Sequence, residues 1–389
     1  MPTNRKPITP PLRKETVLKL VDEVFGDDLH QKRVLSLSNA AMGAIASGCL
    51  AIHAIGAGLA QAEELDPKHC IKQVDRLLSN DRIEPWELFD DWVPFILGER
   101  KEIVVILDWT DFDKDGHTTL LLSLVTGHGR GTPLIWTTVE KASLKDRRNF
   151  HEDAVVVKLR QIVPKDVKVT LLADRGFADT HFFQHLRELG FHYLIRIREN
   201  FEIKTKEGES QPALLFVPEN GRTRGLLDVQ LTHQGYEVEQ VALCHKKDMK
   251  EPWCLATSRK DISAAEAVAL YARRWGIETV FRDIKDYRFG MGMKSVRTKS
   301  TDRRDRLFLI SALAIALLVM LGAAGEAVGL ERKIKANTVK TRSYSLWRQG
   351  CIYYALLPGM KEADACALIN KFHELMAQHR VFRQVFGIL

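Results

Sequence analysis

The chain has 389 residues, 45% of them apolar and 28% charged. This composition excludes a disordered or fibrous protein, and the length favours two or three domains with sizeable cores. Of the net charge of +7, a local surplus of +6 (eleven Lys/Arg against five Asp/Glu) lies between Leu270 and Arg306, which favours a polyanionic partner there.

The first 97 residues are predicted to be helical. Residues 1 to about 15 are rich in Pro and Lys/Arg and lack the apolar core of a secretory signal, which predicts a disordered basic arm. Apolar spacing predicts helices over 35–49, 51–61 and 68–79, the last with a basic outer face. This arrangement resembles a helix-turn-helix module, although a plain helical bundle has the same pattern. We therefore expect a helical DNA-binding region over 1–97.

An α/β pattern begins at residue 98. The apolar runs 103–107 and 168–173 predict buried strands, and each is followed by an aspartate, Asp108 or Asp174. The other segments predict, in order, strands at 118–125 and 133–139, helices at 149–163 and 180–189, and a strand at 192–198. Residues 98–199 are thus expected to form the first part of an α/β core. The alternating segments of 200–260 predict an all-β insertion.

The core is expected to resume over 261–330, beginning with a helix at about 264–287. Four of its residues fall within an arc of about 60° beside an apolar stripe: Tyr271, Arg274, Glu278 and Lys285. A single carboxylate among two cations and an aromatic ring suits a metal ion beside phosphates. The alternative is a solvated helix face with an i,i+4 ion pair between Arg274 and Glu278.

Residues 307–325 carry no charge, which is typical of a membrane span but also of a helix buried in a large domain. The high Ala and Gly content, Glu326 directly afterwards and the lack of a second span favour the buried helix. Beyond it, residues 331–389 predict amphipathic helices near 341–357 and 361–378. The six cysteines lack zinc-finger spacing, which predicts reduced thiols in a cytosolic protein.

Three carboxylates stand out by position. The order of elements predicts a ribonuclease H-like α/β fold in which the first and fourth strands are adjacent and parallel, so that Asp108 and Asp174 meet and Glu278 faces them. Clustered carboxylates repel unless cations neutralise them, which predicts Mg²⁺ or Mn²⁺, with two ions serving phosphoryl transfer. Each acid alone also has a structural explanation, such as capping a turn, and Asp111 or Asp113 could be the ligand in place of Asp108. The run DFDKDG at 111–116 mimics an EF-hand, but Leu122 stands where that loop requires Glu.

The pattern Y-x2-R-x3-E-x6-K, formed by Tyr271, Arg274, Glu278 and Lys285, resembles the signature of the IS-four family of bacterial DDE transposases. Further blocks are similar to its insertion-sequence-Ten branch: LDWTD (107–111), ADRGF (173–177), EPWCLAT (251–257) and GMGMKSVRT (290–298). The likeness covers roughly residues 30 to 350.

The resemblance implies that Asp108, Asp174 and Glu278 are the catalytic metal ligands. It also implies DNA contacts by Tyr271, Arg274, Lys285, Trp253, Lys294, Arg297 and Lys299. Trp253 would stack on a base that is flipped out while a hairpin forms, which fits the unpairing that a hairpin requires. The alternative for Trp253 is a buried tryptophan at the edge of a β-barrel.

The implied function is cut-and-paste transposition of a bacterial insertion sequence, with a hairpin intermediate at the ends of the element. Its partners would be double-stranded DNA, as terminal inverted repeats and target, and a second copy of the chain in a synaptic homodimer with contacts in 331–389. A cytoplasmic location at the nucleoid follows. The alternatives are a ribonuclease H-like nuclease without strand transfer, a catalytically silent DNA-binding regulator and, more remotely, a membrane protein.

Overall fold

The computed structural model describes residues 14–232 and 234–377, so nearly all of the expected basic arm lies outside the described residues. Five helices come first: α1 (Lys14–Phe25), α2 (Gln31–Ser47), α3 (Ile52–Glu63), α4 (Pro67–Leu78) and α5 (Pro85–Leu97). Local signals set their ends. The Asp66 side chain accepts a hydrogen bond from the backbone N of His69 at 2.8 Å to start α4. Gly48, in the left-handed region at φ 60°, ends α2. The three helices expected in this region are confirmed.

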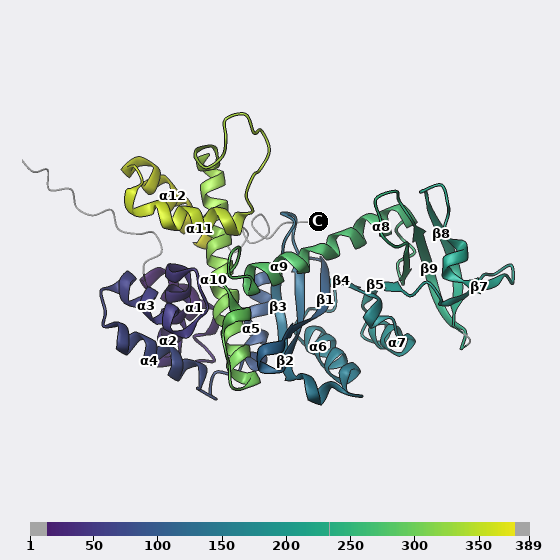
Figure 1. Ribbon diagram of the computed structural model, residues 1–389, viewed down its shortest axis with the longest axis horizontal. Helices are drawn as coiled ribbons and strands as arrows, with labels where there is room; N and C mark the ends of the chain where they lie inside the picture. Colours follow the sequence, from purple (N-terminus) through teal and green to yellow (C-terminus); the bar gives the residue numbers. More distant parts are fainter. Residues whose placement is uncertain (1–13, 233, 378–389) are drawn as a thin grey trace, which may run out of the picture.

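Ten strands form one mixed sheet in the order β3-β2-β1-β4-β5-β10-β9-β8-β6-β7. Their bounds are β1 (Glu102–Phe112), β2 (His117–Val125), β3 (Gly131–Glu140), β4 (Lys168–Ala173), β5 (His192–Ile197), β6 (Glu202–Lys204), β7 (Ser210–Pro212), β8 (Thr223–Leu231), β9 (Tyr236–Cys244) and β10 (Trp253–Thr257). Helices flank this sheet in Figure 1, which confirms a mixed α/β architecture consistent with a ribonuclease H-like fold.

The central strands β1 and β4 are adjacent and parallel, as the sequence predicted, and their pairing ends at Leu107 and Ala173. One detail was wrong, because β1 does not end before Asp108. It continues to Phe112, since its other edge stays paired with β2, where Asp108 lies opposite Leu121. Asp108 therefore lies within a strand whose parallel neighbour has just ended. This leaves its side chain beside the turn that carries Asp174.

The strands of the 200–260 segment continue the central sheet. Strand β10 pairs antiparallel with β5, from Cys254 opposite Ile197 to Thr257 opposite Leu194, and β9, β8, β6 and β7 follow outward. Figure 1 shows this β region extending to the right of the core. The edge of β5 would otherwise expose unpaired backbone groups, and β10 satisfies them.

Two pairs of helices flank the sheet. Helices α6 (Arg148–Ile162) and α7 (Thr180–Glu188) lie on one side of it in Figure 1, and α8 (Ala264–Ala272) and α9 (Gly276–Lys285) on the other. The single helix expected at 264–287 was wrong: a 3-10 turn at Arg273–Trp275 separates α8 from α9. A 3-10 turn winds about 120° per residue against 100° in an α-helix, so three residues rotate the following face by about 60°.

Helix α10 (Thr301–Ala327) stands between the N-terminal helices and the sheet (Figure 1). By length and hydropathy it qualifies as a membrane span, yet 94% of its most apolar window is buried inside the protein, as expected for a core helix. Helices α2 and α3 qualify only as a joint span, and they are bent by 92°.

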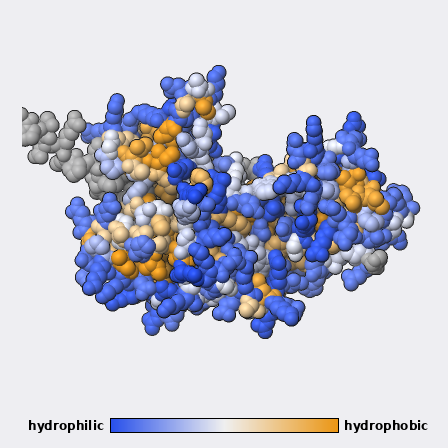
Figure 2. Space-filling view, in the orientation of Figure 1, coloured by the Kyte–Doolittle hydropathy of each residue, from blue (hydrophilic) through white to orange (hydrophobic). Residues whose placement is uncertain are grey.

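Helices α11 (Leu346–Leu356) and α12 (Glu362–Ala377) pack on α10. Glycines let α10 and α11 approach closely, because a Cβ added at Gly350 would lie 1.9 Å from the Leu318 carbonyl oxygen and one at Gly322 1.9 Å from that of Leu346. The face shown in Figure 2 is largely hydrophilic, with apolar patches over the C-terminal helices, the N-terminal helices and the β region. The six cysteines are free thiols.

Candidate active site

The three acids singled out by the sequence line one pocket of about 400 Å³ at the end of the parallel strand pair. Asp108 comes from β1, Asp174 from the turn after β4, and Glu278 from the first turn of α9. The complete lining is Asp108, Trp109, Thr110, Asp111, Thr118, Leu144, Arg148, Asp174, Arg274, Glu278 and Phe281. The pocket therefore gathers residues that are up to 173 positions apart in the sequence (108 to 281).

A tight turn after β4 fixes Asp174. Its Oδ1 accepts a hydrogen bond from the backbone N of Gly176 at 2.7 Å. A Cβ at Gly176 would lie 2.9 Å from that same oxygen, closer than real Cβ contacts come. The glycine of the ADRGF block thus leaves room for the Asp174 carboxylate in its observed position.

The surroundings of Asp108 perturb its ionisation strongly. Burial raises its pKa to about 7, and the negative charges of Asp174 and Glu278 act in the same direction. The Arg274 guanidinium lowers this pKa, because its Nη1 lies 3.2 Å from Asp108 Oδ2. Both side chains are mostly buried. Arg274 therefore pairs with the strand carboxylate rather than forming the alternative i,i+4 pair with Glu278.

The break between α8 and α9 separates the four signature residues. Tyr271, on α8, is buried against the Trp253 ring with centroids 5.0 Å apart, whereas Arg274 and Glu278 line the pocket. Lys285 lies outside the pocket lining. Its Nζ donates to Thr110 Oγ1 at 2.7 Å and to the Asp111 carbonyl at 2.8 Å. Burial, with the nearby Lys294 charge, lowers the pKa of Lys285 to about 8.

The remaining expected DNA contacts lie outside the pocket lining. Trp253 is half-buried at the start of β10, so it is neither the fully buried tryptophan of the alternative nor fully exposed. Lys294, Arg297 and Lys299 are exposed on the segment before α10. Arg297 there bonds the Lys114 carbonyl and Asp115, which ties this segment to the turn after β1.

Sequence reasoning missed three residues beside the acids. Arg148 lines the pocket, and its Nε donates to Glu152 Oε1 at 2.9 Å. Trp109 Nε1 donates to the same oxygen at 2.7 Å. The i,i+4 spacing of Arg148 and Glu152 was the available signal, but such pairs are common on helix surfaces and do not identify a site.

The chemistry of the carboxylates fits a divalent ion. In residues 14–232 and 234–377 no three Asp, Glu, His or Cys side chains lie close enough together to enclose one ion. Carboxylate oxygens are nevertheless the hard ligands that Mg²⁺ and Mn²⁺ prefer. Asp108 Oδ2 lies 3.2 Å from Arg274 Nη1, and Glu278 is exposed, so the three carboxylates are not drawn together in this structure.

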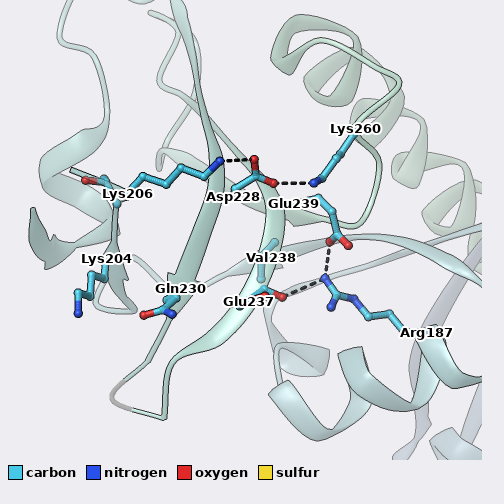
Figure 3. A pocket seen from close by; sticks show the side chains of 10 residues that line it. Arg187, Lys204, Lys206, Asp228, Gln230, Glu237, Val238, Glu239 and Lys260 are labelled. Carbon is cyan, nitrogen blue, oxygen red and sulfur yellow. Dashed lines mark hydrogen bonds and ion pairs between the residues drawn. The ribbon is translucent and has the colours of Figure 1, made fainter. Parts of the chain in front are cut away.

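A second hollow, of about 570 Å³, lies in the β region but has different chemistry. Figure 3 shows Asp228 between Lys206 and Lys260, at 2.7 and 2.6 Å, and Arg187 bonded to Glu239. Both carboxylates named here, Asp228 and Glu239, are already engaged by cations, so this hollow does not gather free carboxylates as the first pocket does. The carboxylate pocket is therefore the stronger candidate for an active site.

A ribonuclease H-like sheet with carboxylates at the end of its parallel pair defines an enzyme class that transfers phosphoryl groups in nucleic acids. Within that class, residues 99–317 match the model of the transposase DDE domain, so the chain belongs to this family. Membership implies a transposase that acts on DNA, and divalent ions are generally used in the family. No curated protein matches the chain.

Proposed function

We propose that the protein is a cut-and-paste transposase of the IS-four type, in its insertion-sequence-Ten branch, with Asp108, Asp174 and Glu278 as catalytic residues. The observation that carries this proposal is the convergence of these acids on one pocket from β1, the turn after β4 and α9. Two bound Mg²⁺ or Mn²⁺ ions would supply activation of water or of a 3′-hydroxyl and stabilisation of the leaving oxygen. The three carboxylates would hold them.

In this proposal the other residues of the site bind and position DNA. Arg274 leaves Asp108 and binds a phosphate when the carboxylate is occupied, and Lys285 binds phosphate near the end of β1. Trp253, braced by Tyr271, stacks on a flipped base. Further phosphate contacts come from Lys294, Arg297 and Lys299.

The reaction proceeds by nicking, attack of the freed 3′-hydroxyl on the opposite strand to give a hairpin, opening of the hairpin, and joining to target DNA. Two copies act together in a homodimer, with contacts from 331–389, in the bacterial cytoplasm at the nucleoid. The proposed units are a DNA-binding region at 1–97, a core at 98–199 and 261–330, and an insertion at 200–260.

A basic hollow between α2 and α4 supports DNA binding by the N-terminal helices. We call it the α2–α4 basic hollow; it measures about 390 Å³ and is lined by His30, Lys32, Arg33, Ser36, Arg76, Leu77, Asn80 and Arg82. It contains four cations and no acid, and none of the four forms an ion pair within the described residues. The first turn of α2 also lacks an acidic residue, so basic side chains lie at the positive end of its dipole. An arrangement that is electrostatically unfavourable in the free protein suits a phosphate backbone.

The basic hollow is fixed to the core through the start of α10. Arg303 Nη2 lies 2.7 Å from Asp75 Oδ1 on α4. Arg306 donates to the carbonyls of Ile83, at 2.7 Å, and Leu78, at 3.0 Å. DNA held in the hollow would therefore keep a defined position relative to the carboxylate pocket.

The experiment is incubation of the purified protein and Mg²⁺ with labelled linear DNA that carries the element's own end, followed by denaturing electrophoresis. A hairpin on the end fragment, absent with Glu278→Gln, is expected. Glu188→Gln, an exposed carboxylate on α7, is the matched control and should cleave normally. Cleavage without joining would favour a nuclease. Binding without any cut would favour a silent regulator.

A further inference from the structure

The Arg148 guanidinium is held in place before any ligand arrives. It lies over two aromatic rings, with its Cζ 5.5 Å from the Trp109 centroid and 5.6 Å from that of Phe177. Its Nε donates to Glu152 Oε1 at 2.9 Å. Cation–π contacts with two rings, together with one hydrogen-bonded nitrogen, restrict the position of the guanidinium.

Glu152 acts as the anchor of this arrangement. It is only 3% exposed, and its Oε1 accepts hydrogen bonds from both Arg148 and Trp109. Burying a carboxylate is costly unless it is paired and hydrogen-bonded. The burial of Glu152 beside the pocket is therefore offset by these two hydrogen bonds, one of which orients Arg148.

The Nη end of Arg148 lies in the carboxylate pocket, near Asp174. The side chain lines the carboxylate pocket and is 47% exposed. Its Nη2 lies 3.7 Å from the position that a Cβ on Gly176 would take, and that position is 2.9 Å from Asp174 Oδ1. Within the described residues neither Nη atom has a hydrogen-bond partner. Arg274, the other guanidinium of the lining, is engaged by Asp108.

We propose that Arg148 binds the phosphodiester backbone of the DNA strand held over Asp174, with its two Nη groups donating to non-bridging oxygens of one phosphate. This inference rests on the proposed DNA transposase function and adds a substrate-binding residue to that site. A guanidinium presents a planar fork that matches phosphate geometry, and a preoriented fork loses little side-chain entropy on binding. Arg148 thus contributes the positive charge that the strand needs beside the carboxylates.

The test is a methylphosphonate scan, in which single phosphates near the cleavage site are replaced by a neutral group. Binding in Ca²⁺ and single-turnover cleavage in Mg²⁺ are measured for the wild type and Arg148→Ala. Hydrogen bonds to charged groups contribute about 1.5–3 kcal/mol, so the contacted phosphate should cost the wild type ~10- to 100-fold in affinity. The same replacement should cost Arg148→Ala almost nothing, because its partner is already absent.

Two variants separate phosphate binding from a structural role. Arg148→Lys keeps the positive charge but loses the planar guanidinium. Replacing the contacted phosphate should therefore cost this variant less affinity than it costs the wild type, but more than it costs Arg148→Ala. Arg147→Ala removes an exposed neighbouring charge and should show the wild-type scan. If every methylphosphonate costs Arg148→Ala as much as the wild type, Arg148 contacts no phosphate and the inference is wrong. A wild type that shows the coupling in binding but never cleaves would instead refute the proposed catalytic function.

Discussion

Replacing Asp108 by Asn should stabilise the folded protein at alkaline pH while it abolishes cleavage. Burial, together with Asp174 and Glu278, raises the pKa of Asp108 from an ordinary 3.8 to about 7. The folded state therefore holds this proton more tightly than the unfolded chain does. The free energy of unfolding therefore falls as the pH rises from about 4 to about 7, because in this range the Asp108 carboxyl ionises in the unfolded chain but stays protonated in the folded protein. Asparagine mimics the protonated carboxyl and avoids this loss.

The size of the effect follows from the same shift. Each tenfold difference in proton affinity corresponds to about 1.36 kcal/mol, so the ionised carboxylate costs the fold up to about 4 kcal/mol above pH 7. The side chain is 16% exposed, so solvent screening is limited, although relaxation makes this figure an upper bound. The stability difference between Asp108→Asn and the wild type should shrink towards zero as the pH falls to about 4.

Urea unfolding of both proteins in metal-free buffer across this pH range provides the assay. Mg²⁺ added at pH 8 should raise the urea midpoint of the wild type, because a bound cation neutralises the carboxylates, but should raise that of Asp108→Asn much less. If Asp108→Asn is no more stable than the wild type at pH 8, the ionised Asp108 carboxylate does not destabilise the folded protein. The electrostatic argument for a cation site would then fail.

Three further predictions follow from other parts of the molecule. Changing the four cations of the α2–α4 basic hollow to Gln should weaken the salt dependence of duplex DNA binding. The slope of the logarithm of the association constant against the logarithm of salt concentration should fall in magnitude by up to about 3.6, or about 0.9 per phosphate contact. Lys204→Gln, in the β region, is a single-charge control that should leave the slope unchanged. Trp253→Ala should leave the first nick unchanged on denaturing gels but reduce hairpin yield about tenfold, because base stacking contributes about 1–3 kcal/mol; equal loss of both products would contradict the stacking role. Gly350→Ala should cost about 1–3 kcal/mol in urea unfolding by pushing α11 off α10, whereas Gly359→Ala, which meets nothing within 4 Å, should be neutral.

The centre of the fold was predictable because its signals are local and redundant. Two apolar runs of strand length, each followed by an aspartate, were enough to place Asp108 beside Asp174 once parallel pairing was assumed. The uncharged run 307–325 was expected to be a buried helix because of its Ala and Gly content, and it is buried as part of α10. Patterns of apolar residues predict such elements well, because the same residues are the ones that the folded protein buries.

Other features depend on contacts that spacing does not encode. The spacing of the signature residues predicted one helix face, but the 3-10 turn at Arg273–Trp275 separates Tyr271, which packs against Trp253, from the residues of α9. Lys285 lies on the same helix as Glu278, two turns further on, and bonds Thr110 outside the pocket lining. The sequence of residues 272–276 (ARRWG) contains no signal that predicts this 3-10 turn. Arg148 was missed for a similar reason. The position of its side chain depends on contacts with Trp109 and Phe177, which belong to different elements.

The pairing of β10 with β5 has a consequence for how this protein can be re-engineered. A segment that leaves and re-enters the core through neighbouring strands is attached along a ladder of backbone hydrogen bonds, from Cys254 to Thr257, rather than through two flexible linkers. Removing residues 202–257 would bare the edge of β5, and exposed edges recruit other chains. The β region is therefore not an interchangeable cassette. A shortened version would have to keep β10, or supply another strand in its place, to remain free of aggregation.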